Sequence, residues 1–241
     1  MTKHPLRKLL PLCLFCLSTP TIATPLKLMT DTFFPFSYQE QGMAKGVNID
    51  VVQLIAKRMA LDIELEFMPW QRAYRDLTNN ERHALFPVIY TAERSQHLSF
   101  ACSIGIDTTY LYVRQSAAVK PKTLEEAKDM RSIAQAGSYQ SQLLIENGFS
   151  NLTTVSSNQQ IFDMLNKARF EVVALGESAY TSIQENTTEQ LISTGIRLFE
   201  TKYCIAFPKN YPQAEITQWQ EHLTQIHAEG TYAEILERYK Q

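Results

Sequence analysis

The sequence predicts an α/β protein of two lobes joined by a hinge. Short runs rich in β-forming residues alternate with helical patterns, which is typical of a sheet built from crossover units. The alternation starts again in the second half of the chain. Each half has roughly a hundred residues, a common domain size. Two lobes linked by two crossings form a hinge with a cleft, and such clefts are the usual places for ligands.

The first half is expected to begin with a strand and a helix. The segment 48–60 brings Ile49, Val52 and Ile55 to one helical face, and Asn48 is its expected N-cap. The segment 63–67, "IELEF", alternates apolar and charged residues as a half-buried strand does. In chain order we expect strands at 26–30, 63–67 and 84–89, and helices at 48–60 and 70–77.

The second half repeats this alternation. Thr123 and Glu126 form a capping box that opens a short helix, and Gly148 closes the next one. We expect strands at 131–135, 152–155, 171–175 and 203–209, a turn and helix at 137–148, and helices at 158–169, 214–230 and 231–240. With crossings near 112–117 and 198–203, lobe one would comprise residues 24–113 and 203–241, and lobe two residues 114–202.

The first 23 residues have the pattern of a secretory signal peptide. A basic start, "MTKHPLRK", precedes a short apolar core, "LLPLCLFCL", and small residues at Thr21 and Ala23 suit cleavage. The apolar core is too short to cross a bilayer, and Pro11 and Pro20 disfavour a buried helix. We therefore expect export to the periplasm with cleavage near Ala23.

Removal of this segment makes the chain more acidic. It takes away three basic residues and no acid, which leaves 218 residues, 20 basic and 25 acidic, and a net charge near −5. Such a charge argues against nucleic acid as a partner, because nucleic acid needs a basic surface. No later stretch is apolar enough to span a membrane, and we expect a monomer.

Two cysteines remain in the mature chain, Cys102 and Cys204. In an oxidising compartment they form either a disulfide or two buried free thiols. The histidines at 83, 97, 222 and 227 are scattered, and the last two are five residues apart rather than four. We therefore expect no metal site and no cofactor.

Several segments resemble periplasmic solute-binding proteins of the polar amino-acid type, family 3 of the bacterial extracellular solute-binding proteins. They are "TDTFFPFSYQEQGMAKGVNIDVVQLIAKRM" (30–59), "TAERSQHLSF" (91–100) and "LTQIHAEGTYAEILERY" (223–239). "AGSYQSQLL" (136–144) and "MLNKARFEVVALGESAY" (164–180) stand where the ligand loops of the second lobe belong. The resemblance covers essentially the whole mature chain. It implies a two-lobed type II periplasmic-binding-protein fold that closes over a small solute and hands it to an ABC transporter.

The resemblance implies that Arg94 holds the carboxylate of the ligand. A guanidinium offers a planar fork of donors that matches a carboxylate, and its charge does not titrate away. The alternative is a surface ion pair with Glu93, which would contribute little. Adjacent residues on a helix point apart, which weakens this alternative.

Aromatic residues and one acid are the next candidates. Trp70 matches an aromatic that stacks on the ligand in the family, and Phe33 matches one in the first strand–helix loop, opposite it. Core packing is the alternative, and we prefer it for Phe34 and Phe36. Asp31 either meets a cationic ligand side chain, as in relatives that bind basic amino acids, or caps the following turn.

The second lobe and the segment after Trp70 add two candidates. Ser138 follows Gly137 at the start of a helix, where N–H groups and a hydroxyl suit an anion, and an N-cap role is compatible with this. Tyr139 stands in the place of a small hydroxyl residue common in the family. Arg72 either projects into the cleft as a second anion contact or is solvated.

The chain departs from the family pattern in two places. Amino-acid binders carry an aspartate for the ligand's ammonium at the end of the strand matched by "EVVAL", where this chain has Gly176 followed by Glu177. Either Glu177 takes over or the ligand is not an α-amino acid, since a buried unpaired charge is costly. Before the arginine element, Pro87 has no N–H and Ile89 has no hydroxyl to donate to the ligand carboxylate. The predicted carboxylate pocket thus has fewer donors than is usual in the family, and Arg72 would compensate for them.

We predict an exported, non-enzymatic binding protein for a small anionic or zwitterionic solute, such as an amino acid, with an ABC-transporter permease as partner. The ligand would shift an open–closed equilibrium, because it contacts both lobes only in the closed state. One alternative is an enzyme on the same fold, such as a cyclohexadienyl dehydratase, with Glu177 as proton donor. Another is a sensory partner that docks on a membrane receptor.

Overall fold

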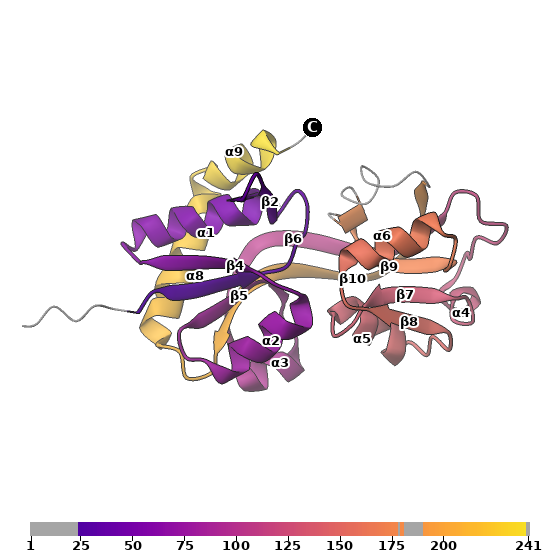
Figure 1. The fold of residues 1–241 in the computed structure, drawn as a ribbon, viewed down its shortest axis with the longest axis horizontal. Coiled ribbons are helices and arrows are strands. Elements are labelled where there is room, and N and C mark those ends of the chain that lie inside the picture. Colours follow the sequence, from indigo (N-terminus) through magenta and orange to yellow (C-terminus); the bar gives the residue numbers. More distant parts are fainter. Residues whose placement is uncertain (1–23, 178, 181–189, 240–241) are drawn as a thin grey trace, which may run out of the picture.

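The computed structural model describes residues 24–177, 179–180 and 190–239. Figure 1 shows two lobes side by side, each with strands in its middle and helices on both sides of them. The predicted signal peptide, residues 1–23, lies outside the described residues. Within the described part of the chain, no helix combines the length and apolarity needed to cross a membrane.

One mixed sheet runs through both lobes in the order β4-β1-β5-β10-β6-β9-β7-β8. Strands β1, β4 and β5 pair in parallel in one lobe, and β7, β8 and β9 pair in parallel in the other. Strands β6 and β10 pair antiparallel to each other and to their outer neighbours. The strands are β1 (Leu26–Thr30), β4 (Ile63–Phe67), β5 (His83–Ile89), β6 (Leu98–Arg114), β7 (Ser132–Gln135), β8 (Leu152–Val155), β9 (Val172–Gly176) and β10 (Leu191–Pro208).

The helices cover both faces of the sheet. In lobe one, Leu28 packs with α1, α8 and α9 on one face, and its neighbour Met29 packs with α2 on the other. In lobe two, Val172 packs with α4 and α5, and Val173 packs with α6. Successive strand residues point to opposite faces, so each strand contributes to two cores. The helices are α1 (Val47–Arg58), α2 (Trp70–Asn79), α3 (Ala92–His97), α4 (Leu124–Ala127), α5 (Tyr139–Glu146), α6 (Asn158–Asn166), α8 (Gln213–Ala228) and α9 (Thr231–Arg238).

Two long strands, β6 and β10, connect the lobes (Figure 1). The sequence predicted only the last part of β10 and did not predict β6 as a strand. Register shifts between Ser193 and Arg197 and between Tyr203 and Cys204 interrupt the alternation by which a strand is recognised. The strand β6 pairs with β9 from Thr109 onward, and β10 pairs with β5 from Tyr203 onward.

Cys102 and Cys204 form a disulfide that joins these two long strands. They are direct partners in the antiparallel pairing of β6 with β10. Of the two states that the sequence left open, the structure has the disulfide. The bridge closes a chain segment that contains strands β7, β8 and β9.

The helix α1 begins earlier than predicted, and a small hairpin before it was not predicted. The N-cap of α1 is Gly46 rather than Asn48, and Asn48 is buried in the first turn. Gly46 has a φ of 123°, and a Cβ on it would overlap the carbonyl of Phe36, so the position requires glycine. A separate hairpin of β2 (Tyr38–Glu40) and β3 (Met43–Lys45) directly precedes Gly46.

Candidate functional site

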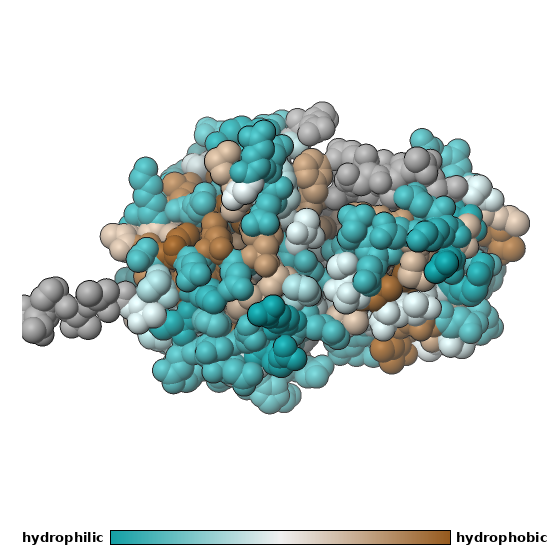
Figure 2. All heavy atoms as spheres, viewed as in Figure 1, coloured by the Kyte–Doolittle hydropathy of each residue, from teal (hydrophilic) through white to brown (hydrophobic). Residues whose placement is uncertain are grey.

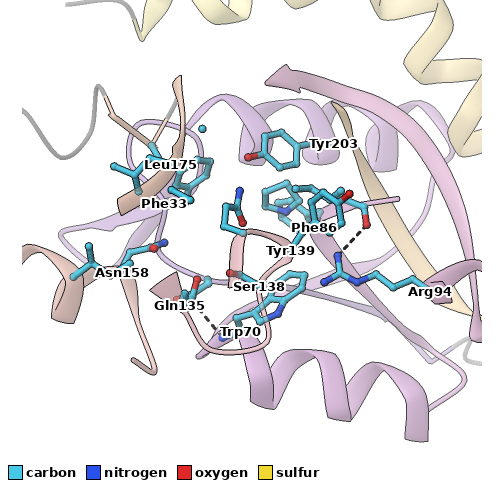
Figure 3. A pocket seen from close by; sticks show the side chains of 18 residues that line it. Phe33, Trp70, Phe86, Arg94, Gln135, Ser138, Tyr139, Asn158, Leu175 and Tyr203 are labelled. Atoms are coloured by element: carbon cyan, nitrogen blue, oxygen red, sulfur yellow. Dashed lines mark hydrogen bonds between the residues drawn. The ribbon is translucent and has the colours of Figure 1, made fainter. Parts of the chain in front are cut away.

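A cavity of about 110 Å³ lies where the two lobes meet. Since one water position needs about 10–15 Å³ on this measure, the cavity has room for roughly ten such positions, which suits a small solute. Figure 3 shows side chains from both lobes directed toward it. Its lining includes Asp31, Phe33, Trp70, Phe86, Ile89 and Arg94 from lobe one, Gln135, Ser138, Tyr139, Asn158, Leu175 and Gly176 from lobe two, and Tyr203 from β10.

Arg94 is a buried cation in the wall of this cavity, with 7% of its surface exposed. Thr91 caps the short helix α3 that carries it, through a 3.1 Å bond from the Arg94 N–H to the Thr91 hydroxyl oxygen. The guanidinium donates to the carbonyl of Ile89 at 2.9 Å and to that of Gly137 at 3.4 Å. Burial lowers the pKa of Arg94. A charge withdrawn from water in this way favours an anionic partner.

The alternative of a surface ion pair with Glu93 does not describe Arg94 in this structure. Among the described residues, no carboxylate lies within ion-pair distance of its guanidinium. Glu93 instead accepts a hydrogen bond from Gln142 at 3.1 Å. The segment from Ala92 to His97 forms the helix α3, so Glu93 and Arg94 are adjacent residues on a helix.

The N-terminus of α5 faces the cavity beside Arg94. Ser138 is the N-cap, and its hydroxyl oxygen accepts from the N–H of Ser141 at 3.1 Å. The N–H groups of Tyr139 and Gln140 occupy the first two helical positions, which have no acceptor within a helix. Both residues line the cavity. The N-cap role considered for Ser138 is confirmed. Free N–H groups at a helix start suit an anion, and the contact of Ser138 with an anion stays a prediction.

Two of the aromatic candidates, Trp70 and Phe33, line the cavity. Trp70 is the first residue of α2, and its indole N–H donates to the carbonyl of Gly137 at 3.0 Å. The guanidinium of Arg94 lies 5.5 Å from the Trp70 ring centroid, within cation–π range. Phe33 stacks on Phe36 with 5.2 Å between ring centroids, and Phe36 packs against the core of lobe one, as preferred for it.

Asp31 also lines the cavity, and its carboxylate is heavily hydrogen-bonded. It accepts from the N–H groups of Thr32 at 2.8 Å and Trp70 at 3.3 Å, and from the Gln135 amide at 2.7 Å. The bond to the Trp70 N–H places a negative charge at the start of α2, where the helix dipole favours it. Burial raises the pKa of Asp31, although these three hydrogen bonds oppose the rise.

The lobes contact each other directly around the cavity. Trp70 and Arg94 of lobe one both donate to the Gly137 carbonyl of lobe two. Gln135 of lobe two donates to Asp31 of lobe one. These contacts surround the cavity from both sides, so the structure has the geometry of a closed two-lobed protein.

Two candidates lie elsewhere, and several lining residues had not been predicted, among them some with polar side chains. Arg72 and Glu177 are both exposed and do not line the cavity. Gln135, Asn158 and Tyr203 line it. Gln135 ends a parallel strand, and the rule that ligands bind beyond the carboxyl ends of such strands could have identified it. Tyr203 has no comparable signal, because its strand was only partly predicted. No group of metal-ligating side chains occurs among the described residues.

Comparison with known proteins assigns the chain to a protein family. The family described as bacterial extracellular solute-binding proteins, family 3, matches residues 26–241. The chain belongs to this family. No curated protein sequence matches the chain significantly. The family is one of binding proteins, in agreement with the expectation of a non-enzymatic function.

Solved structures show the same two-lobed periplasmic-binding-protein fold. The arginine-, lysine-, histidine-binding protein ArtJ from Geobacillus stearothermophilus is 21% identical, with a TM-score of 0.79 over 90% of this chain and 95% of that chain. A mutant of ArgBP from T. maritima is 18% identical, with a TM-score of 0.79 over 89% and 95%. The GluR0 ligand-binding core from Nostoc punctiforme, in complex with L-glutamate, is 20% identical, with a TM-score of 0.78 over 89% and 99%. At these identities the likeness concerns the fold.

Proposed function

We propose that this family 3 protein encloses a small amino acid, or a related carboxylate-bearing solute, in the cavity between its lobes. The observation that carries the proposal is the buried guanidinium of Arg94, which faces the cavity next to the start of α5. Two carbonyl oxygens do not neutralise a full positive charge, whereas a carboxylate accepts a bidentate bond. Solved proteins of the same fold include one bound to arginine and one bound to L-glutamate, in line with such a ligand.

The remaining lining residues suit the rest of such a solute. Trp70 and Phe33 offer ring faces to an aliphatic or flat side chain. Asp31 and Gln135 offer polar groups that could recognise a side-chain end. The size of the cavity excludes long peptides and agrees with a single amino acid.

The test is calorimetry on the mature protein with a panel of amino acids and small organic acids. Arg94→Gln should weaken binding of every carboxylate ligand by about 30-fold or more, because a buried charge contact of this kind is worth roughly 2–5 kcal/mol. Arg94→Lys keeps the positive charge but not the planar fork of donors, so it should lose less affinity than Arg94→Gln does. Arg75→Ala, an exposed arginine of α2, is the matched control and should bind normally. Full affinity in Arg94→Gln would refute the proposal.

The proposal includes export to the periplasm and delivery to an ABC transporter. Periplasmic extract should contain a chain that starts at Thr24, as read by N-terminal sequencing. A strain that lacks the protein should lose uptake of the ligand. Retained uptake together with a lost transcriptional response would favour a sensory partner instead.

The dehydratase alternative has its own test. Its candidate proton donor, Glu177, is exposed and does not line the cavity, which disfavours this role. Incubation with prephenate or arogenate should leave both unchanged. Turnover that Glu177→Gln abolishes would establish the enzyme and set the binding proposal aside.

A further inference from the structure

The carboxylate of Asp107 occupies the space in which a side chain at position 176 would begin. Gly176 ends β9 and lines the cavity. A Cβ built on Gly176 would overlap Oδ2 of Asp107, and the three atoms nearest to it all belong to this one carboxyl group. Gly176 does not have a positive φ, so its backbone conformation does not require glycine. The neighbouring carboxylate of Asp107 requires it.

The sheet explains how two distant residues come together here. Asp107 lies on β6, two residues before Thr109, and Thr109 is the direct partner of Gly176 on β9. On its other side, β6 pairs Asp107 with Thr201 of β10. Asp107 therefore stands where the long strands pass from one lobe to the other. Only 5% of its surface is exposed.

Tyr203 holds the carboxylate at this place. Its hydroxyl donates to Oδ2 of Asp107 at 2.7 Å, and its ring lines the cavity. The ring also meets that of Phe33 edge-on, with 6.4 Å between centroids. Figure 3 shows the Tyr203 hydroxyl directed away from Arg94, toward the side where Phe33 and Leu175 lie. Asp107 itself does not line the cavity, but its carboxylate adjoins two residues that do, Gly176 and Tyr203, on the side away from Arg94.

The electrostatics around β6 agree with a negatively charged region there. Burial raises the pKa of Tyr112, a buried tyrosine of the same strand, and the charges of Glu177 and Asp107 raise it further. The cavity has a cation on one side and this anionic region on another, a pattern that complements a zwitterion.

We propose that Asp107 is the residue that selects for an amine: its carboxylate, seated on Gly176 and oriented by Tyr203, holds the ammonium group of an amino-acid ligand whose carboxylate binds Arg94. The inference rests on the proposed function and adds a specificity residue from a connecting strand. A ligand ammonium enclosed in the cavity needs an anionic partner to offset its lost hydration. Asp107 supplies it from the position that a side chain at 176 would otherwise fill.

The test uses Asp107→Asn, which keeps the shape of the side chain and an acceptor for the Tyr203 hydroxyl but removes the charge. The probes are L-glutamine, L-glutamate and L-arginine, each with the analogue that lacks only the α-amine. The variant should bind the amino acids about 10- to 100-fold more weakly, and the analogues within about threefold of wild type. If Asp107 had a purely structural role, Asp107→Asn would weaken the binding of the amino acid and of its analogue by the same factor.

The second measurement uses variants that displace the carboxylate of Asp107 or move it to position 176. Gly176→Ala should displace the Asp107 carboxylate and weaken amino-acid binding, while the same change in an Asp107→Ala background should have little further effect. Asp107→Ala combined with Gly176→Asp moves the carboxylate to β9 and should restore at least tenfold of the affinity that Asp107→Ala loses. Melting temperatures of all variants identify any that fail to fold.

The outcomes separate this inference from the proposed function. Wild type that binds the analogues as tightly as the amino acids would overturn the role of Asp107 and leave Arg94 in place. Equal losses for both members of a pair in Asp107→Asn would do the same. Wild type that binds none of the six probes or any other carboxylate would overturn both.

Discussion

The side-chain amide of Gln135 donates a 2.7 Å hydrogen bond to the carboxylate of Asp31 across the cleft. This contact exists only when the lobes are close, so it favours the closed state. Gln135→Ala should weaken ligand binding by about fivefold, because a hydrogen bond of this kind contributes about 1 kcal/mol net. Calorimetry measures the change.

Gln142 offers a matched control for this prediction. Its amide also donates from lobe two to an acid of lobe one, Glu93, at 3.1 Å, but at an exposed edge. Exposed polar pairs contribute little, so Gln142→Ala should change the affinity less than twofold. Equal effects of the two variants would argue against a special role of the buried contact.

The raised pKa of Asp31 predicts a pH dependence of stability. Because burial raises it above the ordinary 3.8, the folded protein favours the neutral acid. The contribution of Asp31 to stability is therefore greatest below about pH 3.8 and falls as the pH rises toward and through the folded pKa. Asp31→Asn has no such titration. In a series of thermal scans, its melting temperature relative to wild type should rise as the pH increases above about 3.8, and a constant difference would contradict this.

Trp70 should report ligand binding by its fluorescence. The chain has two tryptophans, and the other, Trp219, is fully buried in the core of lobe one. A ligand beside Trp70 changes the surroundings of its indole, whereas Trp219 does not line the cavity. The emission change on adding ligand should vanish in Trp70→Phe and persist in Trp219→Phe, with calorimetry as the control for binding. Persistence in Trp70→Phe would place the ligand elsewhere.

The disulfide between Cys102 and Cys204 should stabilise the folded protein. The two residues are 102 apart in sequence, and closing a loop of this length removes entropy from the unfolded chain. Cys102→Ala with Cys204→Ala should lower the free energy of unfolding by about 2–5 kcal/mol in urea titrations. Ligand affinity should change little, since neither cysteine lines the cavity. Unchanged stability would show that the bridge does not form.

Local patterns of the sequence predicted most helices and short strands to within a few residues. Thr123 and Ser138 accept from N–H groups of their helices, because capping depends on neighbours three residues away. Arg94 could be proposed as an anion site because the segment 91–100 resembles the family element that carries this arginine, and a guanidinium matches a carboxylate with a planar fork of donors. The long strands β6 and β10 were missed in large part, since their register shifts are set by partner strands.

The sequence by itself determined the alternation of elements, the caps and the presence of a cation near the end of a strand. Only the tertiary structure decided which acid lies by Gly176, because Asp107 reaches it through the pairing of β6 with β9. It likewise decided that Cys102 meets Cys204 and that Gln135 meets Asp31. The physical reason is that local preferences act over a few residues, whereas these contacts depend on strand register and on how the two lobes close.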